Sequence, residues 1–529
     1  MDQRGDGTSP RPKVELVAST GDIAATTTRH TSSGSDGAYY SAAAAVSGNG
    51  KDSIRSYFES AQWTADGTTI LTYSSSHLIQ GYIVPEDLLS PDKPAPLPLA
   101  PQAVIQLPER SDVLAAAPYF SLAEPYTNQV LASARDHPIQ LFYLSSSPSP
   151  PPSPSPSTTT AAAAVYPFTK TSRSETFLSA SSLIWPGPGS HFVAGSRSLL
   201  AKFDASRPGA GSEPVLRVKT IPSERHLLKG GGVGMRGTVS ALGAQPDSSS
   251  PYASPHLGLV AAGTWTRWVG LYDFGGAGEC VAAWSVAGAE TGEGKKAVGT
   301  EIGGSGITQT VWSPCGRYLL VAERRARGVL VYDVRVTGRL LACLTGRDAA
   351  DSSQRIACDV FPGSPSSSSG GGFEVWSGTA AGAGGGGGGM VKVWEGVGAR
   401  EGAHEPSWAW RAHDDPSTTV GAACLHPSGS VVATCAGSWT FSDGDGVDGE
   451  ASSPSSSAAA EAAAPEAEAD DLSWMWRRNR ESSLKIWSIT SDGSDGGNNG
   501  GNDGYDDHDD DHAPEGMVIR GGPIGDVVL

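Results

Sequence analysis

A recurring unit of apolar strand, tight turn and second apolar strand runs through most of the chain. Its clearest copies are Ala61–Gly67 followed by Thr69–Tyr73, Leu183–Gly189 followed by His191–Gly195, Val311–Gly316 followed by Tyr318–Ala322, and Cys424–Gly429 followed by Val431–Cys435. A glycine ends each turn because glycine adopts the positive φ angles that tight turns need. A third strand follows at Ile79–Ile83, Leu199–Asp204, Val329–Asp333 and Leu484–Trp487. This pattern predicts an all-β chain built from one repeated unit.

Weaker copies of the unit lie about midway between the clear ones. They are Asn128–Ala134 with Ile139–Tyr143, Gly258–Gly263 with Val269–Asp273, and Phe373–Gly378 with Val391–Glu395. A repeat of short strands whose last strand ends in an aromatic residue or Asp is typical of WD-repeat propeller blades, which take ~40–45 residues before loop insertions. A β-sandwich would not produce a motif at such even spacing. We therefore expect an all-β, seven-bladed WD-repeat β-propeller.

The ring of a propeller must close, because each blade exposes two apolar faces that only its neighbours cover. Closure usually occurs when one terminus lends a strand to a blade formed by the other. Val14–Val17 and Met517–Arg520 are both short, apolar and strand-like. The sequence alone does not choose between them.

Low-complexity segments divide the chain. We expect a low-complexity N-terminal segment at 1–50, the propeller at 51–490 and an acidic, mostly disordered tail at 491–529 that contains the possible closing strand. The propeller should carry disordered low-complexity insertions at 145–165, 363–372, 380–390 and 442–472. These segments are rich in Ser, Pro, Gly, Ala or acids, and they cannot bury enough apolar surface to offset the entropy of ordering.

The formal net charge of −18 is concentrated in two segments. Residues 442–472 and 490–515 carry many acids and no Lys or Arg. Without these segments, the acids equal the 38 Lys and Arg in number. The folded part is therefore expected to be neutral, so overall charge neither excludes nor favours an RNA partner.

Motifs of catalysis and metal binding are missing from the sequence. The histidines at 77, 191, 256, 413 and 426 are dispersed, and no nucleophile elbow, P-loop or HExxH motif occurs. The glycine run at 384–389 lacks the Lys and Ser/Thr that would let it hold phosphate. The segment His508–His512 is more typical of a solvated acidic tail than of a cation site. We expect no enzymatic activity, no cofactor, no metal and no small-molecule substrate.

Cysteine usage and hydropathy indicate the compartment. Six cysteines lie at 280, 315, 343, 358, 424 and 435 without any CxxC pair, which favours free structural thiols in a reducing environment. The first 30 residues carry no apolar core of a signal peptide, and no stretch of 18 apolar residues occurs. We therefore expect neither secretion by the standard route nor a membrane partner.

Two clusters combine the residue types that bind RNA, which are Arg or Lys for phosphates and aromatic side chains for unstacked bases. Arg324, Arg325 and Arg327 occupy a predicted hairpin of the fifth unit, where a solubilising hairpin tip is the alternative interpretation. The segment 474–480 contains Trp476, Arg477, Arg478 and Arg480 before the last strand. Its alternative is a strand that places tryptophans in the core and a charged edge outside.

Several segments resemble the telomerase Cajal-body WD-repeat protein family. The resemblance is strongest over Phe58–Thr72 and Tyr82–Leu88, and it continues in order through Ala132–Leu141, Phe203–Gly209 and Gln354–Ile356. It implies binding of small Cajal-body or telomerase RNA, ribonucleoprotein partners and a location in the nucleus. Its fungal relatives are associated with pre-mRNA splicing, so the RNA may differ. Arg355 becomes a candidate RNA-binding residue only through this resemblance, and a salt bridge between blades is its alternative.

The expected function is therefore that of a non-catalytic nuclear ribonucleoprotein scaffold that binds a small structured RNA and supports its localisation or assembly. The alternative is a protein–protein adaptor, either a splicing-associated factor or a substrate receptor of a ubiquitin ligase. The insertions of the second, sixth and seventh units depart from the family pattern. They leave the number of blades intact, but they put the family's binding surface in doubt.

Overall fold

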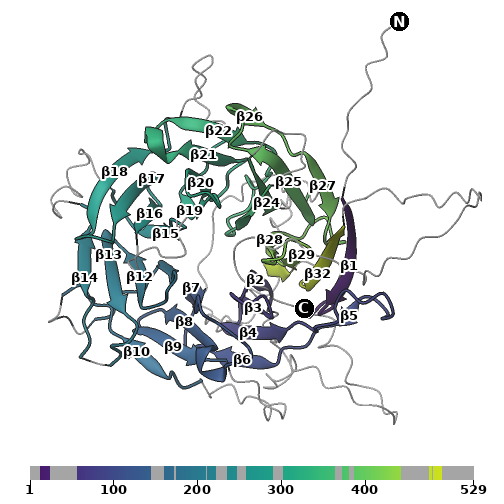
Figure 1. Cartoon of the computed structure of the whole chain (residues 1–529), viewed down its shortest axis with the longest axis horizontal. Helices are drawn as coiled ribbons and strands as arrows, with labels where there is room; N and C mark the ends of the chain where they lie inside the picture. Colours follow the sequence, from purple (N-terminus) through teal and green to yellow (C-terminus); the bar gives the residue numbers. More distant parts are fainter. Residues whose placement is uncertain are drawn as a thin grey trace, which may run out of the picture.

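The structure is a computed structural model in which the described residues form a ring of seven sheets, each built on four antiparallel strands (Figure 1). It describes residues 12–23, 56–144, 160–171, 174, 176–209, 211–221, 235–246, 258–289, 302–363, 372–380, 387–441, 476–478 and 481–490. The predicted seven-bladed propeller is confirmed. Most of the expected insertions and the whole tail 491–529 lie outside the described residues.

The first four blades follow one another along the chain, and each has four strands. Blade 1 contains β2 (Phe58–Trp63), β3 (Thr69–Ser74), β4 (Leu78–Ile83) and β6 (Ala103–Gln106); blade 2 contains β7 (Ser111–Ala116), β8 (Gln129–Ala134), β9 (Ile139–Tyr143) and β10 (Ala164–Tyr166). Blade 3 contains β11 (Ser182–Ile184), β12 (His191–Ser196), β13 (Leu199–Asp204) and β14 (Leu216–Lys219); blade 4 contains β15 (Val239–Ala244), β16 (Leu259–Thr264), β17 (Trp268–Asp273) and β18 (Glu279–Ser285).

The remaining blades complete the ring. Blade 5 contains β19 (Ile307–Trp312), β20 (Tyr318–Glu323), β21 (Val329–Asp333) and β22 (Leu340–Leu344); blade 6 contains β23 (Cys358–Pro362), β24 (Phe373–Gly378), β25 (Met390–Val397) and β27 (Trp408–Arg411). Blade 7 contains β28 (Val420–Leu425), β29 (Val431–Ala436), β32 (Leu484–Thr490) and β1 (Lys13–Ser19). The described residues include no α-helix, and hence none that is long and apolar enough to cross a membrane.

The second strand of each blade is the most deeply buried. β3 and β29 are buried at every residue, and β8, β12, β16 and β20 at every residue but the first. The outer strands are more exposed, and β18 begins with three exposed residues. This gradient follows from radial packing, because neighbouring blades cover both faces of the inner strands. Apolar runs without alternation in the sequence therefore mark second strands.

Tryptophans at the end of the first strand link neighbouring blades. Trp63 Nε1 donates to the carbonyl oxygen of Cys424, 3.0 Å away, and so ties blade 1 to blade 7. Trp312 Nε1 makes the equivalent bond from blade 5 to Gly243 of blade 4, at 2.9 Å. Both side chains also cover apolar surface between the blades. The tryptophan of the repeated unit is thus a residue that joins blades as well as a core residue.

The ring closes through the N-terminal segment. β1 pairs antiparallel with β32, from Lys13 opposite Thr490 to Ser19 opposite Lys485. A short strand from blade 1, β5 (Leu97–Pro98), then pairs in parallel with the far edge of β1. Of the two segments left open by the sequence, Val14–Val17 supplies the closing strand, whereas Met517–Arg520 lies outside the described residues.

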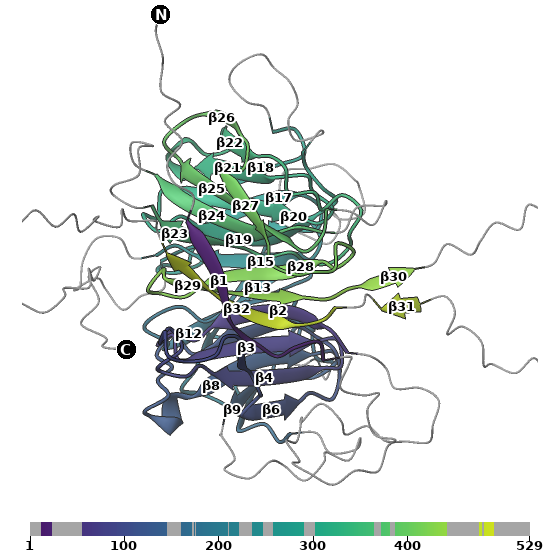
Figure 2. The ribbon, with the colours of Figure 1, turned by 90° about the vertical axis from the view of Figure 1, so that its right-hand side faces the viewer.

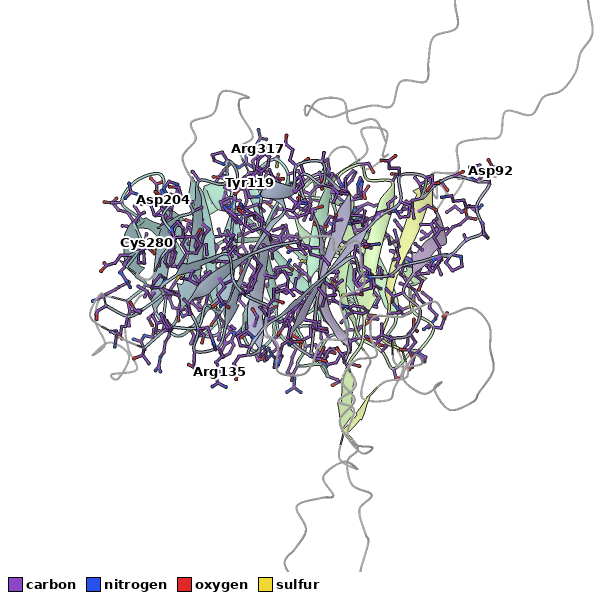
Figure 3. All side chains as sticks on the ribbon, turned by 90° about the horizontal axis from the view of Figure 1, so that it is seen from below. Asp92, Tyr119, Arg135, Asp204, Cys280 and Arg317 are labelled. Atoms are coloured by element: carbon purple, nitrogen blue, oxygen red, sulfur yellow. The ribbon has the colours of Figure 1, made fainter. Side chains whose placement is uncertain are left out.

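The two faces of the ring are named here by the residues labelled in Figure 3. The Arg135 face carries the loops that join the second and third strands of a blade and those that join consecutive blades. The Arg317 face carries the loops that join the first and second strands and the third and fourth strands. The predicted turn glycines Gly67, Gly189, Gly316 and Gly429 have positive φ angles, and all lie at the Arg317 face.

Candidate nucleic-acid interface

The arginine cluster of blade 5 forms the hairpin between β20 and β21, as predicted, and it lies at the Arg135 face. Arg325 and Arg327 are exposed, Arg324 is half-buried and Ala326 is buried. Arg325 occupies the turn with a φ of 58°, and its Nε donates to the carbonyl oxygen of Ala350 at 3.0 Å. The hairpin therefore presents three guanidinium groups around one buried alanine.

An ion pair between a buried carboxylate and Arg267 of blade 4 supports this hairpin. Glu323, the last residue of β20, is 2 % exposed. Its carboxylate accepts hydrogen bonds from Arg267 Nε at 2.7 Å and Nη2 at 3.0 Å, and one from the backbone N–H of Gly304 at 3.0 Å. Bidentate Arg–carboxylate pairs fix geometry as well as adding energy. Glu323 thus holds the hairpins of blades 4 and 5 against each other.

A second arginine, which is buried, ties the hairpin to the loop that precedes blade 6. Arg347 is 1 % exposed, and burial lowers the pKa of its guanidinium. It donates to the carbonyl oxygen of Glu323 at 3.3 Å and to that of Ile356. Because Ile356 follows Arg355, the predicted residues of blades 5 and 6 share one buried support.

Arg355 crosses the mouth of the central channel at the Arg135 face. Its guanidinium donates to the carbonyl oxygens of Asp112 in blade 2 and Ser181 before blade 3, at 3.2 and 3.5 Å. Burial lowers the pKa of Arg355, the charge of Asp112 raises it, and the nearby charges of Arg324 and Arg110 lower it. Arg355 does link blades, as its alternative interpretation supposed, but these two bonds go to carbonyl oxygens rather than to a carboxylate. Whether it also contacts RNA stays a prediction.

Acidic side chains offset part of the positive charge at the mouth of the channel. Glu59 accepts from Arg110 Nη2 at 3.5 Å, and burial raises the pKa of Glu59 while the charge of Arg110 lowers it. Tyr57 lies beside both, and burial raises its pKa to about 12. The channel mouth is therefore a mixed-charge surface, and the excess of positive charge lies around it.

The second predicted cluster forms a separate two-stranded ribbon. β31 (Trp476–Arg478) pairs with β30 (Trp439–Phe441), with Trp476 opposite Phe441 and Arg478 opposite Trp439. The ribbon projects from the Arg135 face, away from the blades (Figures 2 and 3). The ribbon pairs with none of the described blade strands, and its contact with RNA stays a prediction. Arg480 lies outside the described residues.

Charge is distributed unequally between the described loops of the two faces. Loops of the Arg135 face carry the bases Arg110, Arg135, Lys170, Arg197, Arg236, Arg267, Arg324, Arg325, Arg327, Arg347, Arg355, Arg477 and Arg478, against the acids Asp22, Glu109, Asp136, Asp348, Asp351, Asp414, Asp415 and Glu481. Loops of the Arg317 face carry Lys93, Arg207, Arg317, Arg335, Arg339 and Arg400, against Asp66, Glu86, Asp87, Asp92, Glu124, Glu213, Glu401 and Glu405. In these loops, bases exceed acids only at the Arg135 face.

Sequence reasoning missed Trp265, at the tip of the blade 4 hairpin. Its side chain is 47 % exposed, and the guanidinium carbon of Arg324 lies 5.7 Å from the centre of its ring. That distance is typical of a cation–π contact. The available signal was a bulky aromatic residue in Thr264–Arg267, a position where a hairpin of the repeat usually carries small or polar residues.

The buried histidine of blade 7 has a structural role. His413 is fully buried, with Nε2 3.1 Å from Thr434 Oγ1 and Nδ1 3.0 Å from Glu481 Oε1. Trp487 Nε1 donates to the same Thr434 oxygen at 3.0 Å. Burial lowers the pKa of His413, which favours its neutral form despite the carboxylate of Glu481. This network joins the loop before blade 7 to its second and third strands.

The described residues contain no group of three or more His, Cys, Asp or Glu side chains placed to hold a metal ion. All six cysteines are free thiols. Cys343, Cys358 and Cys435 are buried and Cys424 half-buried, as expected for structural thiols, whereas Cys280 and Cys315 are exposed. The Arg135 face instead gathers guanidinium groups and the exposed indole of Trp265, groups suited to binding through charge and stacking.

Comparison with known proteins supports the resemblance seen in the sequence. No family model matches the chain. It is similar to proteins named telomerase Cajal body protein 1, with 26% identity to that of Bos taurus over 73% of this chain and 59% of the relative, and 25% identity to that of Homo sapiens over 73% and 58%. It is also 24% identical to guanine nucleotide-binding protein negative regulator 1 of Schizosaccharomyces pombe, over 58% of this chain and 66% of the relative. The chain thus spans about three fifths of the length of the telomerase Cajal body proteins that it matches.

Proposed function

We propose that this chain is a non-catalytic scaffold of nuclear ribonucleoproteins that binds a small structured RNA at its Arg135 face. The observation that carries the proposal is the excess of arginines in the loops of that face, joined by the exposed indole of Trp265. Arginine pairs with phosphates, and aromatic side chains stack on unpaired bases. The names of the similar proteins favour Cajal-body or telomerase RNA as the cargo and the nucleus as the location.

The first prediction concerns the two arginine clusters. Replacing Arg324, Arg325 and Arg327 together by Ala should weaken RNA binding about tenfold or more, and should lower the salt slope by about one for each phosphate that is no longer neutralised. Replacing Arg477, Arg478 and Arg480 tests the ribbon in the same way. Filter binding of the purified chain to an H/ACA-type RNA, at several salt concentrations, measures both quantities.

The matched control removes the same charge from the opposite face, through Ala at Arg317, Arg335 and Arg339, and should leave affinity unchanged. Equal loss of affinity in all three variants would show that RNA binding depends on net charge rather than on these two clusters. Unchanged binding in both test variants would discard the site but not the function. Crosslinking and RNA sequencing from cells addresses the cargo, and no enrichment of small nuclear, H/ACA-type or telomerase RNA would overturn that part of the proposal.

One observation favours protein docking as a second function, at the Arg317 face. Tyr119, Tyr126 and Tyr143 of blade 2 are all exposed, Tyr126 most of all at 68 %. Gln129 fixes two of their hydroxyls, since it accepts from Tyr119 at 2.8 Å and donates to Tyr143 at 2.9 Å. Tyr126 donates to Glu124 at 2.7 Å. A preorganised tyrosine surface beside a carboxylate suits a partner segment that contains arginine.

The second prediction tests this docking surface. Tyr119→Ala with Tyr126→Ala should remove crosslinks between the Arg317 face and protein partners in cells, because interface tyrosines often contribute 2 kcal/mol or more, roughly 30-fold in affinity. RNA recovered with the chain should not change. Quantitative crosslinking mass spectrometry compares this variant with Trp265→Ala, the control on the other face. Loss of the same crosslinks in both variants, or in neither, would contradict a docking site made by blade 2.

A further inference from the structure

Trp265 is distinct among the exposed apolar side chains of the described residues. Most of the large exposed apolar side chains lie at the Arg317 face: Leu89, Tyr119, Tyr126, Tyr143, Val215 and Val336. Val281 lies on the outer strand β18. Trp265 alone among them lies at the Arg135 face. The indole of Trp265 is therefore the exposed apolar side chain of this set that lies on the face rich in arginine, where charge and an aromatic surface are available to one ligand.

The indole is already part of a cation–π pair. The guanidinium of Arg324 lies over the Trp265 ring at 5.7 Å, and the side chain remains 47 % exposed with this pairing in place. The pair brings a flat aromatic surface and a positive charge together, although the two residues come from different blades. This combination matches one nucleotide, which has a flat base and a negative phosphate.

The backbone holds both hairpin tips rigidly. Trp265 N donates to the carbonyl oxygen of Thr238 at 3.1 Å, and Arg324 N donates to that of Gly306 at 2.8 Å. Gly306 passes between the tips with a φ of 154°, and a Cβ there would lie only 2.9 Å from the Trp265 carbonyl oxygen. Only glycine fits such an approach. The ion pair of Arg267 and Glu323 locks the same two hairpins beneath. The indole and the guanidinium are therefore preorganised.

We propose that Trp265 and Arg324 form a subsite for one unpaired nucleobase of RNA, in which the base stacks on the indole and the guanidinium faces its phosphate. The subsite rests on the proposed RNA-binding function and specifies it. A base inside an A-form helix is covered by its neighbours on both sides, so it cannot stack on a side chain. The scaffold therefore reads a single-stranded loop or bulge of its RNA rather than a helix.

The test uses the full chain, a fluorescent single-stranded 12-nucleotide oligouridine and the same strand paired to oligoadenosine. Trp265→Ala should weaken binding of the single strand about 5- to 150-fold, the range for loss of one stacked base. Its salt slope should stay unchanged, because no charge is lost. Arg324→Ala should instead lower the slope by about one. Trp265→Phe should restore most of the affinity.

Controls separate failure of the subsite from failure of the function. Leu89→Ala, which removes an exposed apolar side chain from the opposite face, should bind like the wild type. In addition, 5-iodouridine in the oligomer should crosslink to Trp265. If the wild type binds the single strand and Trp265→Ala binds equally well, or if the duplex binds as tightly, the subsite is wrong and the function stands. If the wild type binds neither this oligomer nor structured RNA at low salt, both the subsite and the proposed RNA-binding function are wrong.

Discussion

Deletion of residues 12–23 is expected to abolish cooperative folding of the propeller. The deletion removes the whole ladder between β1 and β32. It also removes bonds that continue this ladder, from Thr20 N to Leu484 O at 3.0 Å and from Ile23 N to Ser482 O at 3.1 Å. Buried Ala18 is lost from the cluster that joins blades 7 and 1. The loss in free energy of unfolding should be about 5 kcal/mol or more, comparable to the whole stability of many domains.

Thermal unfolding followed by circular dichroism measures this effect, and the matched control deletes residues 1–11, which leaves the blades and the β1–β32 ladder in place. We expect the control to unfold as the full chain does and the deletion variant to show a broad transition or none. Hydrogen exchange should rise first in β32, which becomes an open sheet edge. A synthetic peptide of residues 12–23 added in trans should restore part of the protection. A sharp transition at an unchanged temperature would show that β1 does not close the ring.

Glu323→Ala should lower the free energy of unfolding by about 3–5 kcal/mol, the cost of breaking a buried ion pair. The substitution removes the buried carboxylate that accepts two hydrogen bonds from Arg267 and one from the N–H of Gly304. Because Glu323 holds the hairpins that carry Trp265 and Arg324, RNA affinity should fall as well, even where the variant is still folded. Urea unfolding and RNA binding at low temperature measure the two effects separately.

The matched control is Glu401→Ala. Glu401 also forms an ion pair, with Arg339 at 3.3 Å, but its side chain is 61 % exposed. Exposed pairs contribute only about 0–1 kcal/mol, so this variant should be nearly as stable as the wild type. Glu323→Gln should fall between the two, because its amide oxygen still accepts hydrogen bonds but the negative charge and the second acceptor oxygen are lost. Equal and small losses of stability for Glu323→Ala and Glu401→Ala would show that the buried pair does not support the hairpins.

The inner part of each blade could be predicted from the sequence because it follows a local rule. Turn glycines such as Gly67 and Gly316 recur with the second and third strands, and these strands are long and apolar. The outer strands are short and half-exposed, as in β6 and β10, so no pattern distinguishes them from loops. The closing strand could not be chosen either, because its partner β32 lies at the opposite end of the chain and pairing at that separation leaves no local signal.

The candidate interface could be predicted only in pieces. Clusters of arginine stand out along the chain, but their common face depends on the direction in which each strand runs. Arg324 and Trp265 are distant in sequence and meet only because neighbouring blades place their hairpins side by side. Arg355 reaches Asp112 across the channel, an interaction that depends on the curvature of the whole ring. Such long-range contacts arise from packing, which single-sequence patterns do not record.

The pairing of β1 with β32 also sets the order of events during protein synthesis. β1 leaves the ribosome first, but β32 is synthesised only after all the other blades. The ring therefore cannot be completed before Thr490 has been added and β32 has left the ribosome, so closure of the ring is a late step of folding. Until then β1 is an unpaired strand in a nascent chain, the kind of segment that chaperones protect. Blade 1 forms early and contributes β5, so it can hold β1 in parallel and keep it in place for β32.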